Sequence, residues 1–160
     1  MQAVKLPYMG EELSMIVVLP SVRFGLKKLV ERDLTPQKLR TIVSSMEYEQ
    51  VDVKIPKMKI EFQADLNDVM KSMGVVDIFD GSKADLSGIS GKPGLCVSSI
   101  THKAFLEVNE EGSEAAAATA AMVNFCMLPP CQIVCDHPFL VMIQHKSVDM
   151  PLFIGMISDP

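Results

Sequence analysis

The chain has 160 residues, of which 48% are hydrophobic and 22% charged, with a formal net charge of -5 and a pI near 5.2. This composition is ordinary for a globular domain with one sizeable core, so we expect a single domain. The acidic balance and the lack of a Lys/Arg cluster exclude nucleic acid as an expected partner. No apolar run approaches the roughly 18 residues that a membrane-spanning helix needs, so no membrane partner is expected.

The first third of the chain predicts a hairpin followed by two short helices. Apolar residues alternate over positions 4–8 and run continuously over 13–19, which predicts two paired strands. Apolar spacing of three and four residues predicts a short helix across 25–33. Thr35 and Pro36 are the residue types of a helix cap and a first helical position, so a second helix is expected to begin there.

The middle of the chain predicts a strand that changes its buried face. Apolar residues occupy odd positions over 51–55 and even positions over 58–62, on either side of Pro56. Such a change of parity indicates a strand that has bent or passed from one sheet to another. Beyond it, Asp65 as a cap and Gly74 as a stop define a helix with one apolar stripe.

The remainder predicts a loop and three more strands. Residues 77–93 are rich in Gly, Asp, Ser and Lys, which favours a loop with at most a helical turn near 83–86. A long strand is expected over 95–109, and two closing strands over 138–143 and 150–157. Strand hairpins alternating with short helices predict the α+β class.

An alanine-rich stretch follows the long strand. Gly112 lies between acidic and small residues, and positions 115–121 carry almost no side-chain bulk. Alanine favours helix intrinsically, so one interpretation is a short exposed helix. The other is extended backbone that must fit between neighbouring strands. Periodicity does not distinguish them, because the stretch has no separate apolar face.

Three segments resemble a known family. Glu110-Glu-Gly-Ser-Glu-Ala-Ala-Ala-Ala-Thr119 resembles the hinge of inhibitory serpins, which are suicide-substrate protease inhibitors. Ile133-Val-Cys-Asp-His-Pro-Phe-Leu-Val-Met-Ile143 resembles the C-terminal signature of the family, and residues 98–109 resemble the strand before the hinge. The resemblance extends over the whole chain, and the chain is similar to inhibitory members of the ovalbumin or arthropod type.

The resemblance implies an α+β fold that is the C-terminal part of the serpin fold, with mixed and antiparallel sheets, short helices and an exposed reactive-centre loop. Residues 1–160 would form a partial serpin domain, with the hinge and loop at 110–135. The other flank of the sheet that receives the loop would lie outside this chain. The chain alone is therefore expected to be poorly stable, as a fragment or truncated form.

The implied function is inhibition of a serine endopeptidase, not catalysis. A target protease would attack the loop and form a covalent acyl-enzyme, and the freed loop would insert into the central sheet as an added strand. No cofactor or metal is implied. The alternatives are a non-inhibitory binding or storage protein of the same fold and an inactive fragment.

The resemblance also assigns roles to individual residues. Gly112 would give backbone freedom and Ser113 is small enough to be buried when the segment moves. The count forward from Gly112 gives Cys126 as the scissile residue, the count back from Pro138-Phe139 points to Met127, and Phe125 is a further candidate. The apolar character of these residues and their lack of positive charge favour chymotrypsin-like or elastase-like targets. The hinge consists of Glu110, Glu111, Gly112, Ser113, Glu114, Ala115, Ala116, Ala117, Ala118 and Thr119, and the scissile candidates are Phe125, Cys126 and Met127.

His102 has two interpretations. A lone histidine in a strand is more often a hydrogen-bonded core residue than a base. The resemblance places it instead at the shutter, the region beneath the opening of the main sheet. A hydrolase would need His102, His137 or His145 with a nucleophile such as Cys126 or Ser98, and no local motif supports one.

The cysteines and the chain start bear on the compartment. Cys96, Cys126, Cys131 and Cys135 match neither a zinc pattern nor a redox CxxC, so free thiols are expected. The opening residues lack a basic start and do not resemble a signal peptide. The family resemblance nevertheless favours an extracellular, secreted protein, with a cytoplasmic location as the alternative.

Overall fold

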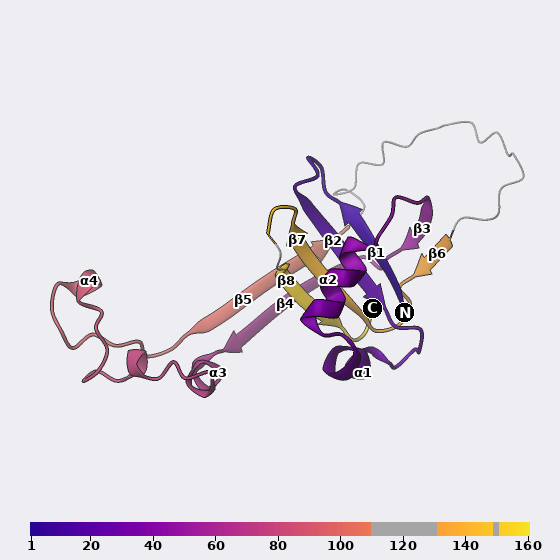
Figure 1. Cartoon of the computed structure of the whole chain (residues 1–160). Helices are drawn as coiled ribbons and strands as arrows, with labels where there is room; N and C mark the ends of the chain where they lie inside the picture. Colours follow the sequence, from indigo (N-terminus) through magenta and orange to yellow (C-terminus); the bar gives the residue numbers. More distant parts are fainter. Residues whose placement is uncertain (110–130, 149–150) are drawn as a thin grey trace, which may run out of the picture. The chain divides into compact units, whose positions relative to one another are not determined.

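The computed structural model describes residues 1–109, 131–148 and 151–160 (Figure 1). They form two compact units, one of residues 1–57 with 108–160 and one of residues 58–107. The predicted hinge, the scissile candidates and Cys126 lie outside the described residues. None of the described helices is long and apolar enough to cross a membrane.

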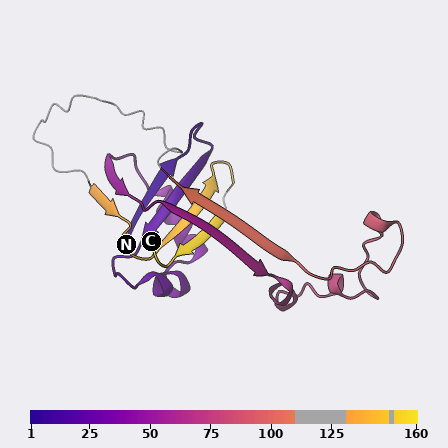
Figure 2. The same ribbon diagram turned by 180° about the vertical axis from the view of Figure 1, so that it is seen from behind.

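The first unit is built on a four-stranded antiparallel sheet in the order β1-β2-β7-β8, which Figures 1 and 2 show from opposite sides. Its strands are β1 (Gln2–Pro7), β2 (Leu13–Leu19), β7 (Phe139–His145) and β8 (Pro151–Ile157). The predicted hairpin is confirmed, since β1 pairs with β2 from Gln2 and Leu19 to Pro7 and Ser14. The two closing strands are confirmed as β7 and β8.

The two central strands are buried because their residues are apolar on both faces. Ile16, Val18 and Phe139 have no exposed surface, and Leu140 is only 2% exposed. Both strands are therefore continuous apolar runs in the sequence rather than alternating patterns. Such runs indicate buried strands, which is why both strands could be predicted from the sequence.

Short helices pack over one face of this sheet. They are α1 (Leu26–Lys28), which continues into the π-turn η1 (Leu29–Asp33), and α2 (Pro36–Ser44). Leu26 and Leu29 join Ile16, Leu140 and Met142 in the core. The predicted cap is confirmed, because the Thr35 hydroxyl accepts a hydrogen bond from the Lys38 N–H at 3.2 Å.

A small parallel sheet pairs β3 (Val51–Lys54) with β6 (Cys131–Val134). The strand that follows Pro56 is β4 (Met58–Asp65), and it belongs to a different sheet. The prediction from the change of parity is thus confirmed: the chain leaves one sheet and enters another near Pro56.

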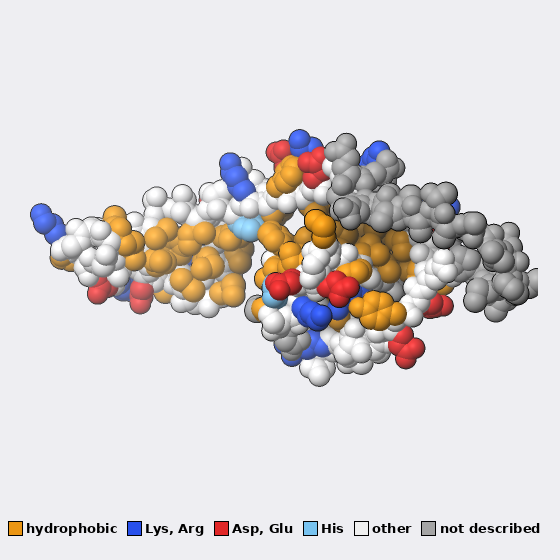
Figure 3. All heavy atoms as spheres, turned by 90° about the horizontal axis from the view of Figure 1, so that it is seen from above, with side chains coloured by type: hydrophobic (Ala, Val, Ile, Leu, Met, Phe, Trp, Pro, Cys, Tyr) orange, Lys and Arg blue, Asp and Glu red, His pale blue; other side chains and the backbone are white. Residues whose placement is uncertain are grey.

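The second unit holds a two-stranded sheet of β4 and β5 (Thr101–Val108), with the short helices α3 (Asn67–Ser72), η2 (Asp77–Phe79) and α4 (Ser87–Ser90). The fold class is α+β, as expected. Apolar side chains are exposed over this unit, as Figure 3 shows. Among them are Phe62, Val69, Met73, Val76, Ile89 and Phe105.

Three local predictions in this unit need correction. The strand expected over 95–109 begins only at Thr101, because Val97 and Ile100 bond to Ile78 and Asn67 instead of to a strand partner. The helical turn expected near 83–86 lies at α4. The Asp65 carboxylate accepts the Asn67 N–H at 2.8 Å, but α3 is shorter than expected and its cap position is Leu66.

Candidate functional site

The candidate site is the segment 110–130, which follows β5 and precedes β6 in the sequence. β5 leads the chain to Asn109, the last described residue before this segment, and β6 carries it onward from Cys131. In the sequence, the hinge Glu110 to Thr119 and the scissile candidates Phe125, Cys126 and Met127 come between these strands, and all of them lie outside the described residues. Nearly all of β5 belongs to the second unit and β6 to the first, so each strand is described by itself.

The incoming strand β5 is half-buried, with Ala104, Leu106 and Val108 on its more covered face. His102 lies near its start, on the same face by strand alternation, but at this end of the strand it is exposed. The His102 ring lies 6.4 Å from the ring of Phe62 on β4, tilted by 57°. The interpretation of His102 as a core residue is therefore wrong for the described part of the chain.

The outgoing strand β6 is held by contacts beyond its ladder with β3. The Gln132 side-chain amide donates to the Asp52 carboxylate at 2.8 Å, across the parallel pair. The Gln2 amide donates to the Gln132 carbonyl at 3.2 Å, which attaches β6 to β1 as well. Just after β6, the Cys135 N–H donates to the Lys54 carbonyl at 2.8 Å. The chain is thus firmly fastened where it leaves the 110–130 segment.

Sequence reasoning missed β6, which it had included in the loop segment 110–135. The strand is only four residues long, and its sequence Cys-Gln-Ile-Val alternates weakly. A usable signal was the prolines at 129 and 130, since paired prolines end one segment and precede another. Gln132 and Asp52 were not predicted as partners because they are 80 positions apart.

The segment between β6 and β7 carries a small polar cluster. His137 lies with Nδ1 2.7 Å from the Asp136 carboxylate and Nε2 2.8 Å from the Pro20 carbonyl oxygen. Arg23 lies 3.6 Å from the same carboxylate. The hydrogen bond to Asp136, and next that to Pro20, raise the pKa of His137. The hydrogen bond from His137 lowers the pKa of Asp136.

A second histidine lies at the far end of β7. The Ser147 hydroxyl is 2.9 Å from His145 Nδ1, and Glu12 is 3.5 Å from His145 Nε2. These are the residue types of a hydrolytic triad. The Ser147 N–H also donates to the same Nδ1, at 3.2 Å. His145 and Ser147 are therefore neighbours in a local turn, in which the Nδ1 atom already accepts a backbone hydrogen bond. This arrangement gives no support to the hydrolase hypothesis.

The described cysteines are free thiols, as expected. Cys96 and Cys131 are exposed and Cys135 is buried. Burial, and next the charge of Asp136, raise the pKa of the Cys135 thiol, so this thiol is held in its protonated, unreactive form. Among the described residues there is no group of three His, Cys, Asp or Glu side chains that could hold a metal ion.

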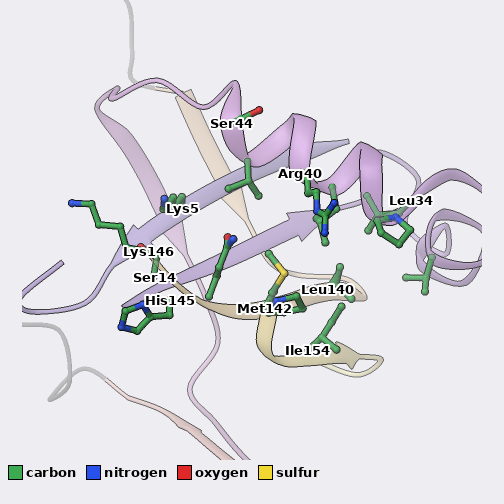
Figure 4. Close-up of a pocket in the computed structure, with 16 residues that line it drawn as sticks. Lys5, Ser14, Leu34, Arg40, Ser44, Leu140, Met142, His145, Lys146 and Ile154 are labelled. Atoms are coloured by element: carbon green, nitrogen blue, oxygen red, sulfur yellow. The ribbon is translucent and has the colours of Figure 1, made fainter. Parts of the chain in front are cut away.

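A cavity of about 520 Å³ lies between α2 and the four-stranded sheet (Figure 4). Leu34, Leu140 and Met142 give it apolar walls, and Lys5, Arg40 and Lys146 add basic groups. The Gln144 side-chain oxygen, also in its lining, is buried without a hydrogen-bond partner. The volume is that of a small-molecule pocket, but it draws no residue from β5 or β6 and is separate from the candidate site.

Comparison with known proteins identifies the protein family of this chain. The family description "Serpin (serine protease inhibitor)" matches residues 1–160, and the chain belongs to the serpin family. The resemblance carried by the hinge-like and C-terminal segments is confirmed. The description of the family names inhibition of serine proteases, which favours the interpretation as part of an inhibitor.

Named relatives are similar over nearly the whole chain. Leukocyte elastase inhibitor of Homo sapiens is 46% identical over 166 residues, which cover 99% of this chain and 44% of that protein. Serpin B3 of Homo sapiens is 46% identical over 164 residues, covering 99% and 41%. The chain therefore spans less than half the length of the curated relatives it matches.

Solved structures agree on the fold. Uncleaved ovalbumin superposes with a TM-score of 0.80 at 34% identity, over 99% of this chain and 39% of that one. A serpin from the trematode Schistosoma haematobium gives a TM-score of 0.78 at 28% identity, over 99% and 41%. The expected serpin fold is confirmed.

Proposed function

We propose that the chain is the loop-bearing part of an inhibitor of serine endopeptidases that acts as a suicide substrate. The observation that carries the proposal is the hinge-like sequence Glu110 to Thr119 in a member of the serpin family. The 46% identity to a protein named for inhibition of leukocyte elastase supports it.

The proposed reaction begins as ordinary proteolysis. The catalytic serine oxygen of the protease attacks the carbonyl carbon of the scissile residue, and the peptide bond breaks. The new amine leaves with a proton, while the carbonyl stays on the protease as an ester. Loop insertion then carries the protease away before water can cleave the ester.

Insertion requires a sheet that can accept another strand next to the segment that enters it. β5 precedes residue 110 in the sequence and is one of two strands in its sheet as far as the described residues show. A strand added to a sheet edge gains a row of backbone hydrogen bonds, and the insertion of a serpin reactive loop is an instance of such strand addition. The small side chains over 115–118 suit alternate burial at little steric cost.

The candidates for the scissile position are Phe125, Cys126 and Met127. Each presents an apolar or weakly polar side chain and none is cationic, so we propose chymotrypsin-like or elastase-like targets. A thiol at Cys126 would also make the inhibitor sensitive to oxidation.

His102 is proposed as the shutter residue. Its position near the start of β5, beside Phe62 of the neighbouring strand β4, supports a role in how these strands separate. The test is His102→Ala, which we expect to change the rate of loop insertion without changing cleavage of the loop.

The cellular compartment is also a proposal. The family resemblance favours secretion, whereas the relatives of the leukocyte elastase inhibitor and serpin B type support the cytoplasmic alternative. We therefore propose a cytoplasmic location, to be tested by fractionating cells that express the longest natural polypeptide containing this chain.

The function is tested with that same polypeptide and purified elastase or chymotrypsin. We expect a covalent complex that survives denaturing electrophoresis and is lost when the catalytic serine of the protease is blocked beforehand. Cleavage of the loop with no such complex would instead support a non-inhibitory binding or storage protein, or an inactive fragment.

A further inference from the structure

The backbone ladder between β2 and β7 stops at a defined point. Its last pair at this end is Val18 with Leu140. Continuing the same register would set Pro20 opposite Pro138. Proline has no N–H, so neither residue can donate to a further ladder hydrogen bond. The Pro20 carbonyl must find its donor elsewhere.

The His137 ring provides that donor. Its Nε2 lies 2.8 Å from the Pro20 carbonyl oxygen, and its Nδ1 lies 2.7 Å from the Asp136 carboxylate. Both oxygens can only accept a hydrogen bond. A neutral imidazole has one N–H, whereas the imidazolium has two. Only the protonated ring satisfies both contacts, and the side chain is just 14% exposed, so water replaces them poorly.

Two charged groups act on the ring, and a further pair lies beside the neighbouring residue Pro138. Asp136 precedes it in the chain, and its carboxylate favours the imidazolium. Arg23, from the connection between β2 and α1, disfavours it but also neutralises part of the carboxylate, at 3.6 Å. Lys27 and Glu31, which line a small cavity with Pro138, pair with each other at 3.9 Å. The hydrogen bonds to Asp136 and Pro20 raise the pKa of His137, whereas burial and the charge of Arg23 lower it. The raising effects are larger, so the pKa is raised.

The opposite end of the same strand pair is closed differently. There the Lys146 N–H donates to the Glu12 carbonyl at 2.7 Å, so the backbone itself completes the ladder. His145 Nδ1 accepts the Ser147 N–H, which a neutral imidazole does without difficulty. Of these two rings, only that of His137 faces two acceptor oxygens and so requires a proton on both nitrogens.

We propose that His137 is a proton-operated clasp that fastens the start of β7 to the end of β2, closed when the imidazole is protonated and opened when it is neutral. The clasp replaces the ladder hydrogen bonds that the two prolines cannot make. It gives the sheet of the first unit a pH-dependent attachment, whatever protease the protein inhibits.

The direction of the pH effect follows from linkage. A histidine with a raised pKa in the folded state contributes stability that is fully present below its ordinary pKa of 6.5. This contribution is lost as the pH rises through the raised value. The clasp is therefore strongest in mildly acidic solution.

The experiment compares the longest natural polypeptide containing this chain with its His137→Gln variant by thermal unfolding. Glutamine keeps one amide donor but cannot become charged. We expect the wild-type Tm to exceed that of the variant by a few degrees near about pH 5.5, and this difference to close near about pH 8.5. His145→Gln is the matched control, with no such closing difference.

A second measurement tests the proposal even if the His137→Gln variant does not fold. The His137 ring is followed by NMR titration in the wild type and in Asp136→Asn. We expect a midpoint above about 6.5 in the wild type and a lower midpoint in the variant. A wild-type midpoint at or below this ordinary value, or a Tm difference that is equal at both pH values, would overturn the clasp.

Discussion

Individual side chains differ sharply in how much they contribute to the stability of the fold. Phe139 opens β7, is fully buried, and is among the largest buried side chains in the described part of the chain. Replacing it by alanine leaves a void that neighbouring strands cannot fill, because interiors are close-packed.

For Phe139→Ala we therefore expect a loss of about 3 to 5 kcal/mol in the free energy of unfolding. Denaturant titration measures it. Phe24→Ala is the control, because Phe24 is 84% exposed, and it should change stability by no more than about 0.5 kcal/mol. Equal losses in the two variants would contradict the burial pattern.

Ser113 tests the proposed function at one residue. Arginine at this position would have to bury a charge as the loop inserts, at a cost of several kcal/mol. Ser113→Arg should thus be cleaved by elastase at an unchanged rate while forming little covalent complex. Ser113→Ala, which is small and uncharged, should form complex like the wild type. Complex formation by both variants would argue against insertion.

At the scale of elements, the strength of a local signal decided which predictions succeeded. Thr35 and Pro36 bring a cap and a first-turn residue together, and α2 begins where they predict. β6 has no comparable signal, because it is four residues long and depends on β3, which is 80 positions earlier in the register. Residues 95–100 look like strand but bond to Ile78 and Asn67.

The cap of α2 can be tested directly. Thr35→Ala removes the hydroxyl that accepts from the Lys38 N–H and should lower the free energy of unfolding by about 1 kcal/mol. Thr35→Ser keeps the hydroxyl and should retain most of this stability. A serine variant as unstable as the alanine variant would mean that the methyl group, not the cap, matters.

At the scale of the whole molecule, the surface of the second unit stands out. Met73 and Ile89 are 74% and 79% exposed, and several other large apolar side chains lie open over residues 58–107 (Figure 3). Exposed apolar area of this kind is a feature of binding surfaces and of aggregation-prone proteins.

Residues 1–160 expressed alone should therefore bind a hydrophobic dye such as ANS strongly and associate with rising concentration. Fluorescence and light scattering measure both effects. Met73→Lys with Ile89→Lys should reduce them, because the charges interrupt the apolar surface. Weak dye binding by the unmodified chain would show that these side chains are covered in solution.

Loop insertion also has a whole-molecule signature. If the cut loop joins the sheet that contains β5, a nicked inhibitor should unfold at a markedly higher temperature than the intact one, because an added strand completes many backbone hydrogen bonds. Calorimetry before and after cleavage is the measurement. An unchanged Tm would favour the binding or storage alternative.

The sequence by itself determined the class, the family and the main elements. Apolar runs, caps and the change of parity at Pro56 are local patterns, and local patterns need no knowledge of distant residues. Only the tertiary structure showed that β6 joins β3, that Gln132 meets Asp52, and that His137 serves a carbonyl left open by two prolines. These contacts join residues up to 117 positions apart, and the register that creates them is set by how whole strands pack.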